Sequence, residues 1–516
     1  MRLYPLQVLA LLLCTLTACA QNEPSFKAFL KTQPNKTFDV LIANGQVVDG
    51  TGRKAYRADV LVREDTIAFI GAVDASLVKV QRVMDAKGKV VTPGFIDTHA
   101  HGDPMGKKGF QNFLAMGATT VILGQDGSHP ENLKTWMQRL DQTGADVNVA
   151  TFVGHGTLRM ESGVKFDSLP TPAQLEKMGQ LLREQLEMGC LGLSTGLEYI
   201  PGMYAPTYEL EHLAKIVGEK GKLITSHVRN EDNDAVEASL EELLVQGKYC
   251  PVHVSHIKAV FGKGRERAEQ LLAQLERARQ RGINVTADVY PYTASFTGIS
   301  ILFPEWALPP NNFDQVVATR REELETYLRN RVNKRNGPQA TLIGTAPFAG
   351  KTLAQLAQEK KKPFEDVLID NIKPGGASAA YFVMDEALQA RFITDSTTMI
   401  CSDGGPDMRH PRGYGTFARI IEEYVVKTNQ LPMEQAIRKM TSLSAKTMGL
   451  TDRGELAVGK KADILVFDPG KVHETTTYES PFQLATGFET ILINGKVSLE
   501  KGKIFPAKNG RLFRKK

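Results

Sequence analysis

Short runs rich in valine and isoleucine alternate with longer amphipathic stretches between about Thr98 and Leu450. Two of the amphipathic stretches are PAQLEKMGQLLREQLEMG and RERAEQLLAQLERARQRG. Repeated β–α units of this kind form a parallel sheet, because two parallel strands need a long crossover between them, usually a helix. Over this length the expected closure is a (β/α)8 barrel, a TIM-like α/β fold with catalytic residues at the C-terminal ends of its strands. The sequence therefore predicts a barrel over residues 98–450.

The alternation is interrupted near residues 303–350, where LFPEWALPPNN precedes a charged helical stretch. We interpret this region as an insertion over the mouth of the barrel. The alternative interpretation is an ordinary irregular loop followed by a helix.

Hairpin patterns flank the barrel on both sides. Residues 38–97 contain FDVLIANGQVVDGTG and ADVLVREDTIAFIG, with alternating apolar runs punctuated by Asn-Gly and Asp-Gly pairs. A similar pattern recurs in residues 451–516, in GELAVGKKADILVFDP and ETILINGKV. We predict that the two segments form one small β-sandwich domain that closes around the barrel.

Residues 1–19 have the pattern of an export signal. Arg2 precedes an apolar stretch from Val8 to Leu16 that is too short to span a bilayer as a mature helix. The segment Leu16-Thr17-Ala18-Cys19 resembles the lipobox of bacterial lipoproteins, in which the cysteine becomes the lipidated N-terminus. An ordinary secretory signal is the alternative, and both interpretations predict export.

No acidic residue directly follows Cys19, which by the lipoprotein resemblance implies an outer-membrane anchor in the periplasm of a Gram-negative bacterium. Residues 20–37 are polar with scattered Pro and Asn, and suit a tether. Membrane contact is then expected only through the N-terminal lipid.

The net charge of +5 comes from interleaved basic and acidic residues, so we expect no nucleic-acid partner. An odd number of cysteines remains after the signal, which indicates no disulfide framework.

Four histidines stand at the ends of apolar runs. In VVTPGFIDTHAHGD an apolar strand runs into His99 and His101, which share a face because alternate residues of a strand point the same way. Two later apolar runs end at His227, in KLITSHVRNE, and at His256, in PVHVSHIKA. Neutral imidazoles on one face are suitable ligands for a Zn²⁺-like ion. By the same parity His253 faces the helices, and we interpret it as structural.

A carboxylate follows another apolar run late in the predicted barrel, at Asp403 in MICSDGG. An Asp-Gly pair is commonly a turn. Hydrolysis at a metal, however, needs a group that takes a proton from water and delivers it to the leaving group. We therefore predict that Asp403 is the catalytic acid–base.

In their order along the chain, these histidines and Asp403 resemble the amidohydrolase superfamily. The motifs GATTVILGQDG, GHGTLR, GLSTGLEYIPG, SHIKAVFGKG, DVYPYTAS and HPRGYGTFAR are similar to the N-acyl-D-amino-acid deacylase (D-aminoacylase) branch, and the resemblance covers nearly the whole mature chain. It implies that His227 and His256 bind the principal zinc and that His99 and His101 form a companion site. One or two divalent metal ions are therefore expected.

At the position of the bridging ligand the sequence departs from this branch. The branch usually has the Cys of a Gly-Asn-Cys-Gly turn, whereas GQDG presents Asp126. A carboxylate can bridge two cations but is a harder ligand than a thiolate, and it favours oxygen-preferring metals more. Glu198 lies near the place where other branches carry a carboxylated lysine, and the absence of a lysine there argues against a hydantoinase or dihydroorotase type.

The resemblance also implies the substrate-binding residues. Arg412 in HPRGYGTF, Lys258 two residues beyond His256, and Tyr292 in DVYPYTAS would hold the free carboxylate of an N-acyl amino acid. His155 would help to polarise the acyl carbonyl. The implied activity is metal-dependent hydrolysis of the amide bond of N-acyl-D-amino acids, which are small-molecule substrates.

Two other functions fit the same residues. A dipeptidase, or another peptide-like amidase of this superfamily, would act on fragments that contain D-amino acids and would use the same hydrolytic chemistry. A metal-binding or solute-binding lipoprotein without catalysis belongs to a different class, and the presence of Asp403 argues against it.

Overall fold

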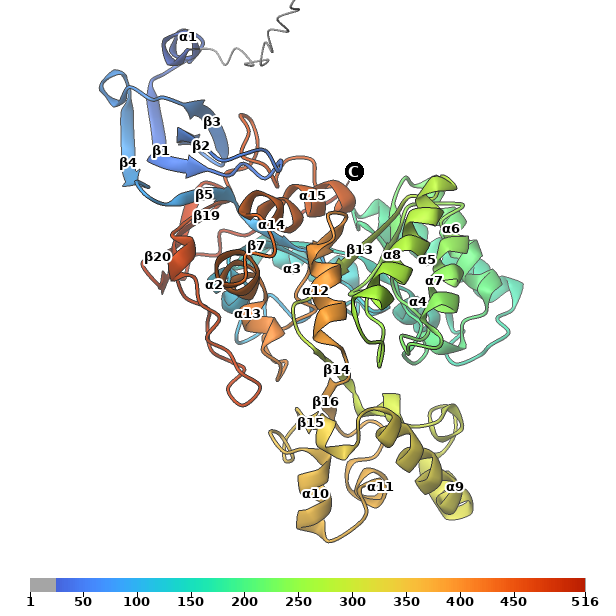
Figure 1. Ribbon diagram of the computed structural model, residues 1–516. Coiled ribbons are helices and arrows are strands. Elements are labelled where there is room, and N and C mark those ends of the chain that lie inside the picture. Colours follow the sequence, from blue (N-terminus) through green and yellow to red (C-terminus); the bar gives the residue numbers. More distant parts are fainter. Residues whose placement is uncertain (1–24, 516) are drawn as a thin grey trace, which may run out of the picture.

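The computed structural model describes residues 25–515, so the predicted signal at residues 1–19 lies outside the described residues. Figure 1 shows three parts: a β domain at the top, a barrel in the middle and a small unit of helices and strands at the bottom. Among the described helices, none is both long and apolar enough to cross a membrane.

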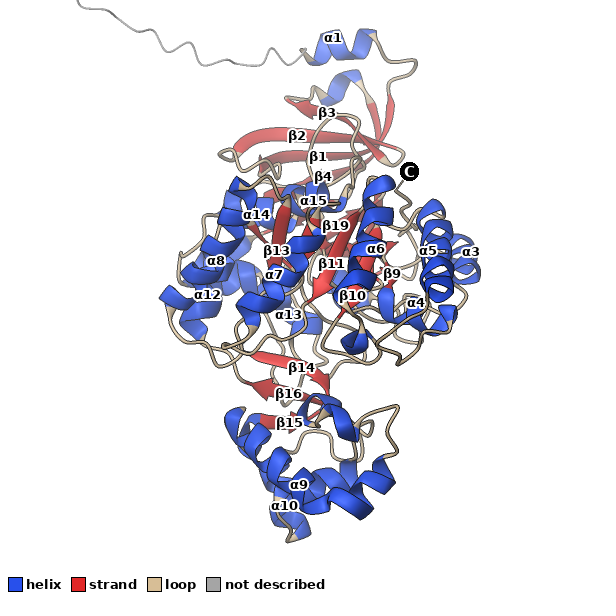
Figure 2. Cartoon of the chain, turned by 90° about the vertical axis from the view of Figure 1, so that its right-hand side faces the viewer, coloured by secondary structure: helices blue, strands red, loops and turns tan. Residues whose placement is uncertain are grey.

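The barrel consists of parallel strands that end near one another on the side of the small unit (Figure 2). Its strands are β6 (Phe95–Asp97), β7 (Ala118–Leu123), β8 (Asn148–Thr151), β9 (Val153–Gly154), β10 (Gly192–Gly196), β11 (Leu223–His227), β12 (Val252–Val254), β13 (Val285–Val289) and β17 (Thr398–Ile400). Neighbouring strands pair in parallel in this order, except that β8 and β9 follow each other along one strand position. The predicted (β/α)8 barrel is therefore confirmed.

Closure of the barrel depends on the chain just after β6 and β17. The amide of Asp403 donates to the carbonyl of His99 at 2.8 Å, and the amide of His101 donates to the carbonyl of Gly404 at 2.8 Å. The last strand is thereby joined to the first, which brings two predicted site residues next to each other although they are far apart in the sequence.

Helices cover the outside of the barrel because each buries one apolar stripe. In α8 (Arg265–Gln280), for example, Leu271, Leu275 and Ala278 are buried while Arg and Glu residues face solvent. The other surrounding helices are α2 (Gln111–Ala115), α3 (Leu133–Thr143), α4 (His155–Ser162), α5 (Pro172–Glu187), α6 (Thr207–Glu219), α7 (Val236–Gln246), α12 (Glu386–Thr394), α13 (Arg412–Arg419), α14 (Met433–Met440) and α15 (Ser442–Met448).

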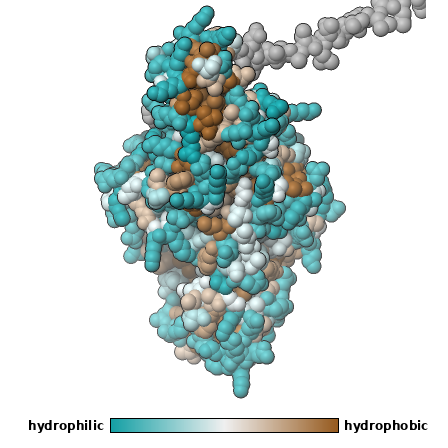
Figure 3. All heavy atoms as spheres, turned by 90° about the vertical axis from the view of Figure 1, so that its left-hand side faces the viewer, coloured by the Kyte–Doolittle hydropathy of each residue, from teal (hydrophilic) through white to brown (hydrophobic). Residues whose placement is uncertain are grey.

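The β domain combines both ends of the described chain in one hydrogen-bonded sheet. Its strands are β1 (Thr37–Val47), β2 (Tyr56–Arg63), β3 (Thr66–Gly71), β4 (Lys79–Asp85), β5 (Val90–Pro93), β18 (Ile464–Phe467), β19 (Phe488–Ile493), β20 (Lys496–Glu500) and β21 (Lys503–Ile504). The two segments join where β5 pairs with β18. The sheet can fold over because β1 pairs with β4 along its first part and with β5 at its end. Figure 3 shows hydrophobic surface gathered over this domain.

Part of the predicted tether is folded. Residues 26–31 form α1 (Phe26–Lys31), whose first turn is capped by the Ser25 hydroxyl. The Phe26 and Phe29 rings lie 5.1 and 5.0 Å from the ring of Phe69 on β3. The tether predicted over residues 20–37 is thus wrong for this helix, because its aromatic side chains bury apolar surface against the β domain.

The interruption of the barrel is a small unit with its own core. It contains β14 (Ala294–Gly298), α9 (Phe313–Lys334), β15 (Thr341–Ile343), α10 (Leu353–Lys360), α11 (Phe364–Val367) and β16 (Ser378–Phe382). In the antiparallel sheet β16 pairs with both β14 and β15. This pairing makes the insertion wider than the predicted 303–350, since residues 294–298 and 378–382 belong to it. Below we call residues 294–382 the insertion.

Lys439 on α14 is a buried amine near the foot of the barrel, and burial lowers its pKa to about 7. The unfolded chain keeps this proton up to about pH 10, so the unfolded state binds more protons between about pH 7 and about pH 10. Stability contributed by this group therefore rises with pH through that window and is lost as pH falls. We expect urea unfolding to show a gain of about 3 kcal/mol from pH 7 to pH 9.5 that Lys439→Met removes. Equal pH dependence in both proteins would contradict this expectation.

Candidate metal centre

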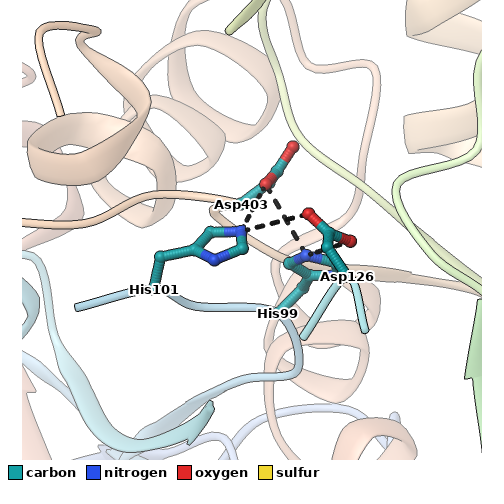
Figure 4. A group of neighbouring side chains, drawn as sticks. All are labelled: His99, His101, Asp126 and Asp403. Carbon is teal, nitrogen blue, oxygen red and sulfur yellow. Dashed lines mark hydrogen bonds and ion pairs between the residues drawn. The ribbon is translucent and has the colours of Figure 1, made fainter. Parts of the chain in front are cut away.

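The predicted ligands converge because each follows the C-terminal end of a barrel strand. His99 and His101 follow β6, Asp126 follows β7, His227 ends β11 and His256 follows β12. Strand pairing in parallel brings these ends to one rim of the barrel. Figure 4 shows His99, His101 and Asp126 pointing toward one another and toward Asp403.

Three groups of side chains could each hold a cation. One consists of Glu198, His227 and Glu231, and the other two are built around Asp126. In the first of these two, the Nε2 atom of His99 lies 3.3 Å from Asp126 Oδ1 and 3.6 Å from Asp403 Oδ1, and the Nε2 atom of His101 lies 3.0 Å from Asp403 Oδ1. In the second, Asp126 Oδ1 lies 3.5 Å from His256 Nε2 and 4.0 Å from His227 Nδ1. Asp126 belongs to both groups, as expected for a bridging ligand.

The chemistry of this cluster fits a divalent cation. Both ring nitrogens of His99 and the Oδ1 atom of Asp126 are buried and have no hydrogen-bond partner in the described structure. Buried polar atoms are costly when unpaired. Ligand atoms about 2.0–2.2 Å from a shared tetrahedral ion lie about 3.4 Å apart, and the distances from Asp126 Oδ1 to His99 and His256 are close to this value. Nitrogen and carboxylate donors in this number suit zinc or a similar ion.

The backbone is strained at three of these positions. The φ angles of Asp126, His256 and Asp403 are 54°, 37° and 49°, in the left-handed region that non-glycine residues rarely adopt. Close approach also requires Gly196 beside Asp126, because a Cβ there would lie 2.2 Å from the Asp126 carbonyl oxygen. The fold thus holds these side chains in fixed positions at a local energetic cost.

Two glutamates orient the imidazoles. Glu198 lies 3.1 Å from His227 Nε2, so that nitrogen can donate to the carboxylate, while Nδ1 faces His256 Nε2 at 3.0 Å. Glu231 lies 3.2 Å from His256 Nδ1, a nitrogen that the Lys258 ammonium also approaches at 2.6 Å. We did not predict Glu231 from the sequence, although its position four residues after His227 was visible.

The Lys258 side chain contacts both Glu231 and His256. Its ammonium donates to Glu231 at 2.7 Å and lies 2.6 Å from His256 Nδ1. The side chain lines a narrow inner pocket, where the predicted contact with a substrate carboxylate stays a prediction. Its positive charge is already matched by Glu231.

Asp403 lies between His101 and Arg412. The Arg412 guanidinium contacts Asp403 Oδ2 at 2.8 Å, opposite the oxygen that faces the histidines. Burial favours the protonated carboxyl, but the positive charges of Arg412 and His256 outweigh it and hold the pKa of Asp403 well below its ordinary value. Arg412 also reaches the carbonyl of Phe296 at 3.2 Å. The geometry thus places Arg412 against the predicted catalytic carboxylate.

Two predicted substrate-binding residues lie elsewhere. The Tyr292 hydroxyl donates to Glu474 at 2.6 Å and does not line the pocket. His155 begins α4 and is fully buried, with its Nε2 atom 2.7 Å from Glu209. Neither assignment fits this structure. The chain turns away from the strand direction before Tyr292, and His155, although it directly follows β9, points its imidazole at Glu209.

Tyr290 stands in the pocket where Tyr292 was expected. It is fully buried, lines the inner pocket and lies under the guanidinium of Arg412, 4.8 Å from the ring centre. We expect Tyr290→Phe to raise KM about tenfold through loss of one hydroxyl donor to a charged group, and Tyr292→Phe to leave KM within about twofold. Steady-state kinetics of both variants, with melting temperature as the folding control, measures this difference. The reverse order of effects would restore Tyr292 to the site.

Two cavities that share lining residues border the cluster. The inner pocket is lined by Tyr290, Asp403 and Arg412, and a wider outer groove of about 740 Å³ includes His101 and Asp126. Both spaces are bounded by residues of the insertion, among them Phe296 and Thr297 of β14. The insertion lies over the mouth of the barrel, where it can shape the substrate site (Figure 2).

The chain matches the amidohydrolase family over residues 82–297 and 393–497, with most of the insertion between the two matched parts. It is 34% identical to an N-acyl-D-glutamate deacylase of Alcaligenes xylosoxydans xylosoxydans over 89% of this chain and 93% of the relative. A D-aminoacylase of the same organism is 32% identical over 89% of this chain and 94% of the relative.

Solved structures give the same assignment. The crystal structure of a D-aminoacylase aligns with this chain with a TM-score of 0.79 and 31% sequence identity. The alignment covers 92% of this chain and 100% of the D-aminoacylase chain. The N-acyl-D-glutamate deacylase of Bordetella bronchiseptica, solved with zinc and a phosphonate inhibitor, has a TM-score of 0.78 and 32% identity over 93% of this chain and 100% of its own. A further D-aminoacylase structure is described as having a binuclear metal centre. This chain belongs to the amidohydrolase family, in its branch of D-aminoacylases and N-acyl-D-amino-acid deacylases.

Proposed function

We propose that this protein hydrolyses the amide bond of N-acyl-D-amino acids and releases a carboxylate and a D-amino acid. The observation that carries the proposal is the convergence of four imidazoles, Asp126 and Asp403 on one rim of the barrel. The relatives described above, which act on N-acyl-D-amino acids or carry zinc, support it.

His99, His101, His227, His256 and Asp126 would hold one or two divalent cations, and zinc fits their donor set. A cation held there supplies Lewis acidity, which lowers the pKa of water and polarises a carbonyl. The protein contributes the fixed geometry, because Glu198 and Glu231 set the ring orientation of His227 and His256.

Asp403 would move the proton. Its Oδ1 atom faces His99 and His101, so a water molecule bound in the cluster would lie within its reach. The positive charges of Arg412 and His256 lower the pKa of this carboxylate and keep it ionised, which is the form that can accept a proton from water. It would then deliver the proton to the amide nitrogen, which leaves poorly until protonated. Arg412 holds the other carboxylate oxygen and fixes the direction in which Asp403 points.

A substrate panel tests this function. Purified protein loaded with zinc should release amino acid from N-acetyl-D-amino acids at least about 100-fold faster, by kcat/KM, than from their L enantiomers. D-containing dipeptides and cyclic ureides serve as the comparison substrates. Faster turnover of dipeptides would favour a peptidase, and hydrolysis of none of the amides would overturn the proposal.

We also propose that the protein is an exported lipoprotein attached through Cys19 to the outer membrane and facing the periplasm. The apolar stretch before Cys19 supports this, and that segment lies outside the described residues. Cys19→Ser should move the protein from the membrane fraction to the soluble fraction of a Gram-negative host. Unchanged fractionation would contradict lipid attachment.

A further inference from the structure

One cation of the inner pocket has no hydrogen-bonded carboxylate. Lys258 donates to Glu231 at 2.7 Å, and Arg412 contacts Asp403 at 2.8 Å. Arg335 lines the same pocket, and its side chain donates no hydrogen bond to any described residue. The pocket therefore contains one arginine that is available to a ligand.

Arg335 comes from the insertion, at the C-terminal end of α9. Its backbone amide closes the helix on the carbonyls of Arg331 and Val332, which fixes the position of the side chain. Only 2% of the residue is exposed, and its Nε atom is buried without a partner. The guanidinium lies 5.0 Å from the ring centre of Tyr381 and 5.8 Å from that of Phe261. A permanent charge is thus held in a largely aromatic environment.

The nearest carboxylate does not satisfy this charge. Asp232 lies 3.7 Å from Arg335 Nη1, beyond hydrogen-bond distance. It already contacts Arg331 at 2.6 Å and Lys334 at 3.3 Å. Lys334 also contacts Asp234 at 3.4 Å, and Glu198 lines the same pocket as Arg335. Neither of these carboxylates, nor Asp232, accepts a hydrogen bond from the Arg335 guanidinium among the described residues, so its donors remain open to a ligand.

A buried guanidinium is stabilised best by a carboxylate, which can accept two parallel hydrogen bonds from it. The α-carboxylate of an N-acyl amino acid lies only two bonds from the scissile nitrogen, so it must stay close to Asp403 and the metal ligands. Lys258 and Arg412 contact those residues, whereas Arg335 contacts none of them. A group that reaches Arg335 must extend further from the scissile bond.

We propose that Arg335 binds a second carboxylate of the substrate, beyond its α-carboxylate. The inference rests on the proposed deacylase function and narrows its substrate class to N-acyl-D-amino acids that carry two carboxylates. The second carboxylate can belong to the amino-acid side chain or to the acyl group, and both sources present the same chemistry to the guanidinium.

Two matched substrate pairs separate these sources. N-acetyl-D-glutamate and N-acetyl-D-glutamine differ in the charge of the side chain, and N-succinyl-D-leucine and N-butanoyl-D-leucine differ in the charge of the acyl group. We expect the native enzyme to prefer the charged member of one pair by at least about 30-fold in kcat/KM, the range of a charge-assisted hydrogen bond. The preferred pair identifies the source.

Arg335→Met should reduce this preference to within about threefold and change turnover of the neutral substrates by less than about threefold. Arg335→Lys should retain part of the preference, because one ammonium cannot replace the paired donors of a guanidinium. Lys334→Met is the matched control, since it removes a positive charge from the neighbouring position, which does not line the pocket, and should leave the preference unchanged.

Three outcomes would overturn the inference: no preference for either charged substrate, equal loss on charged and neutral substrates in Arg335→Met, or the same effect in Lys334→Met. Hydrolysis of the neutral N-acyl-D-amino acids in those cases would leave the proposed function standing. Hydrolysis of none of the four substrates by the metal-loaded native protein would overturn the proposed function as well.

Discussion

Asp403→Asn should lower kcat by about 10³-fold and leave the metal content of the purified protein nearly unchanged. An amide keeps an oxygen toward His101 but cannot take a proton from water or return it to a leaving amine, and general acid–base catalysis contributes about 10²–10⁴-fold. The change also removes the negative charge that Arg412 faces at 2.8 Å, so the thermal midpoint has to be measured beside the kinetics. Turnover with saturating substrate and elemental analysis of the same preparation test the expectation.

Asp407→Asn is the matched control for this experiment. Asp407 lies four residues further along the chain, and its side chain is 82% exposed. The control should therefore keep the native kcat. If Asp403→Asn retained more than about a tenth of the native activity, Asp403 would not be the proton-transfer group.

Removal of a metal-binding imidazole should lower activity by a similar factor, because the protein would then lose bound metal. We expect His227→Ala to lose at least one equivalent of bound metal and to lower kcat/KM by about 10³-fold, because Lewis acidity contributes several kcal/mol to stabilisation of the transition state. His101→Ala should have a smaller effect, since the His101 side chain is 30% exposed at the edge of the cluster, whereas His227 is buried between Glu198 and His256.

His473→Gln provides the control for the histidine series. The His473 side chain is 57% exposed and contacts Glu422, away from the barrel rim. Native metal content and activity are expected for it. Full activity of His227→Ala with unchanged metal content would remove His227 from the set of ligands.

The convergence of the proposed metal ligands could be foreseen in part from strand parity. In a strand, residues an even number of positions apart share a face. A histidine an even number of positions from a residue of the barrel interior therefore also faces the interior, and one an odd number of positions away faces the helices. The rule holds for His227 but fails after β12. That strand ends at Val254, so His256 reaches the cluster from the following turn. His253 does not face the helices as predicted: it is in register with Thr225, and its Nε2 atom lies 3.0 Å from Asp288 inside the barrel.

The tyrosine assigned from the resemblance, Tyr292, lies beyond the end of its strand. β13 stops at Val289, and the chain then turns, so Tyr290 enters the pocket while Tyr292 contacts Glu474. Pro291 in DVYPYTAS marks the end of the strand, but it does not tell which of the two tyrosines enters the pocket. A turn is set by the packing of the insertion that follows it, which local sequence does not describe.

The sequence by itself determined the elements and their ends: parallel strands, amphipathic helices, two flanking hairpin segments and the ligands at strand termini. Periodicity of apolar residues specifies these features because each depends on neighbours a few residues apart. Only the tertiary structure decided which partners surround the ligands, namely Glu231 with Lys258, Arg412 against Asp403, and Arg335 brought into the pocket by the insertion. These contacts depend on how distant segments pack and on which hydrogen-bond donors and acceptors remain unpaired after packing. A local sequence pattern contains no information on either.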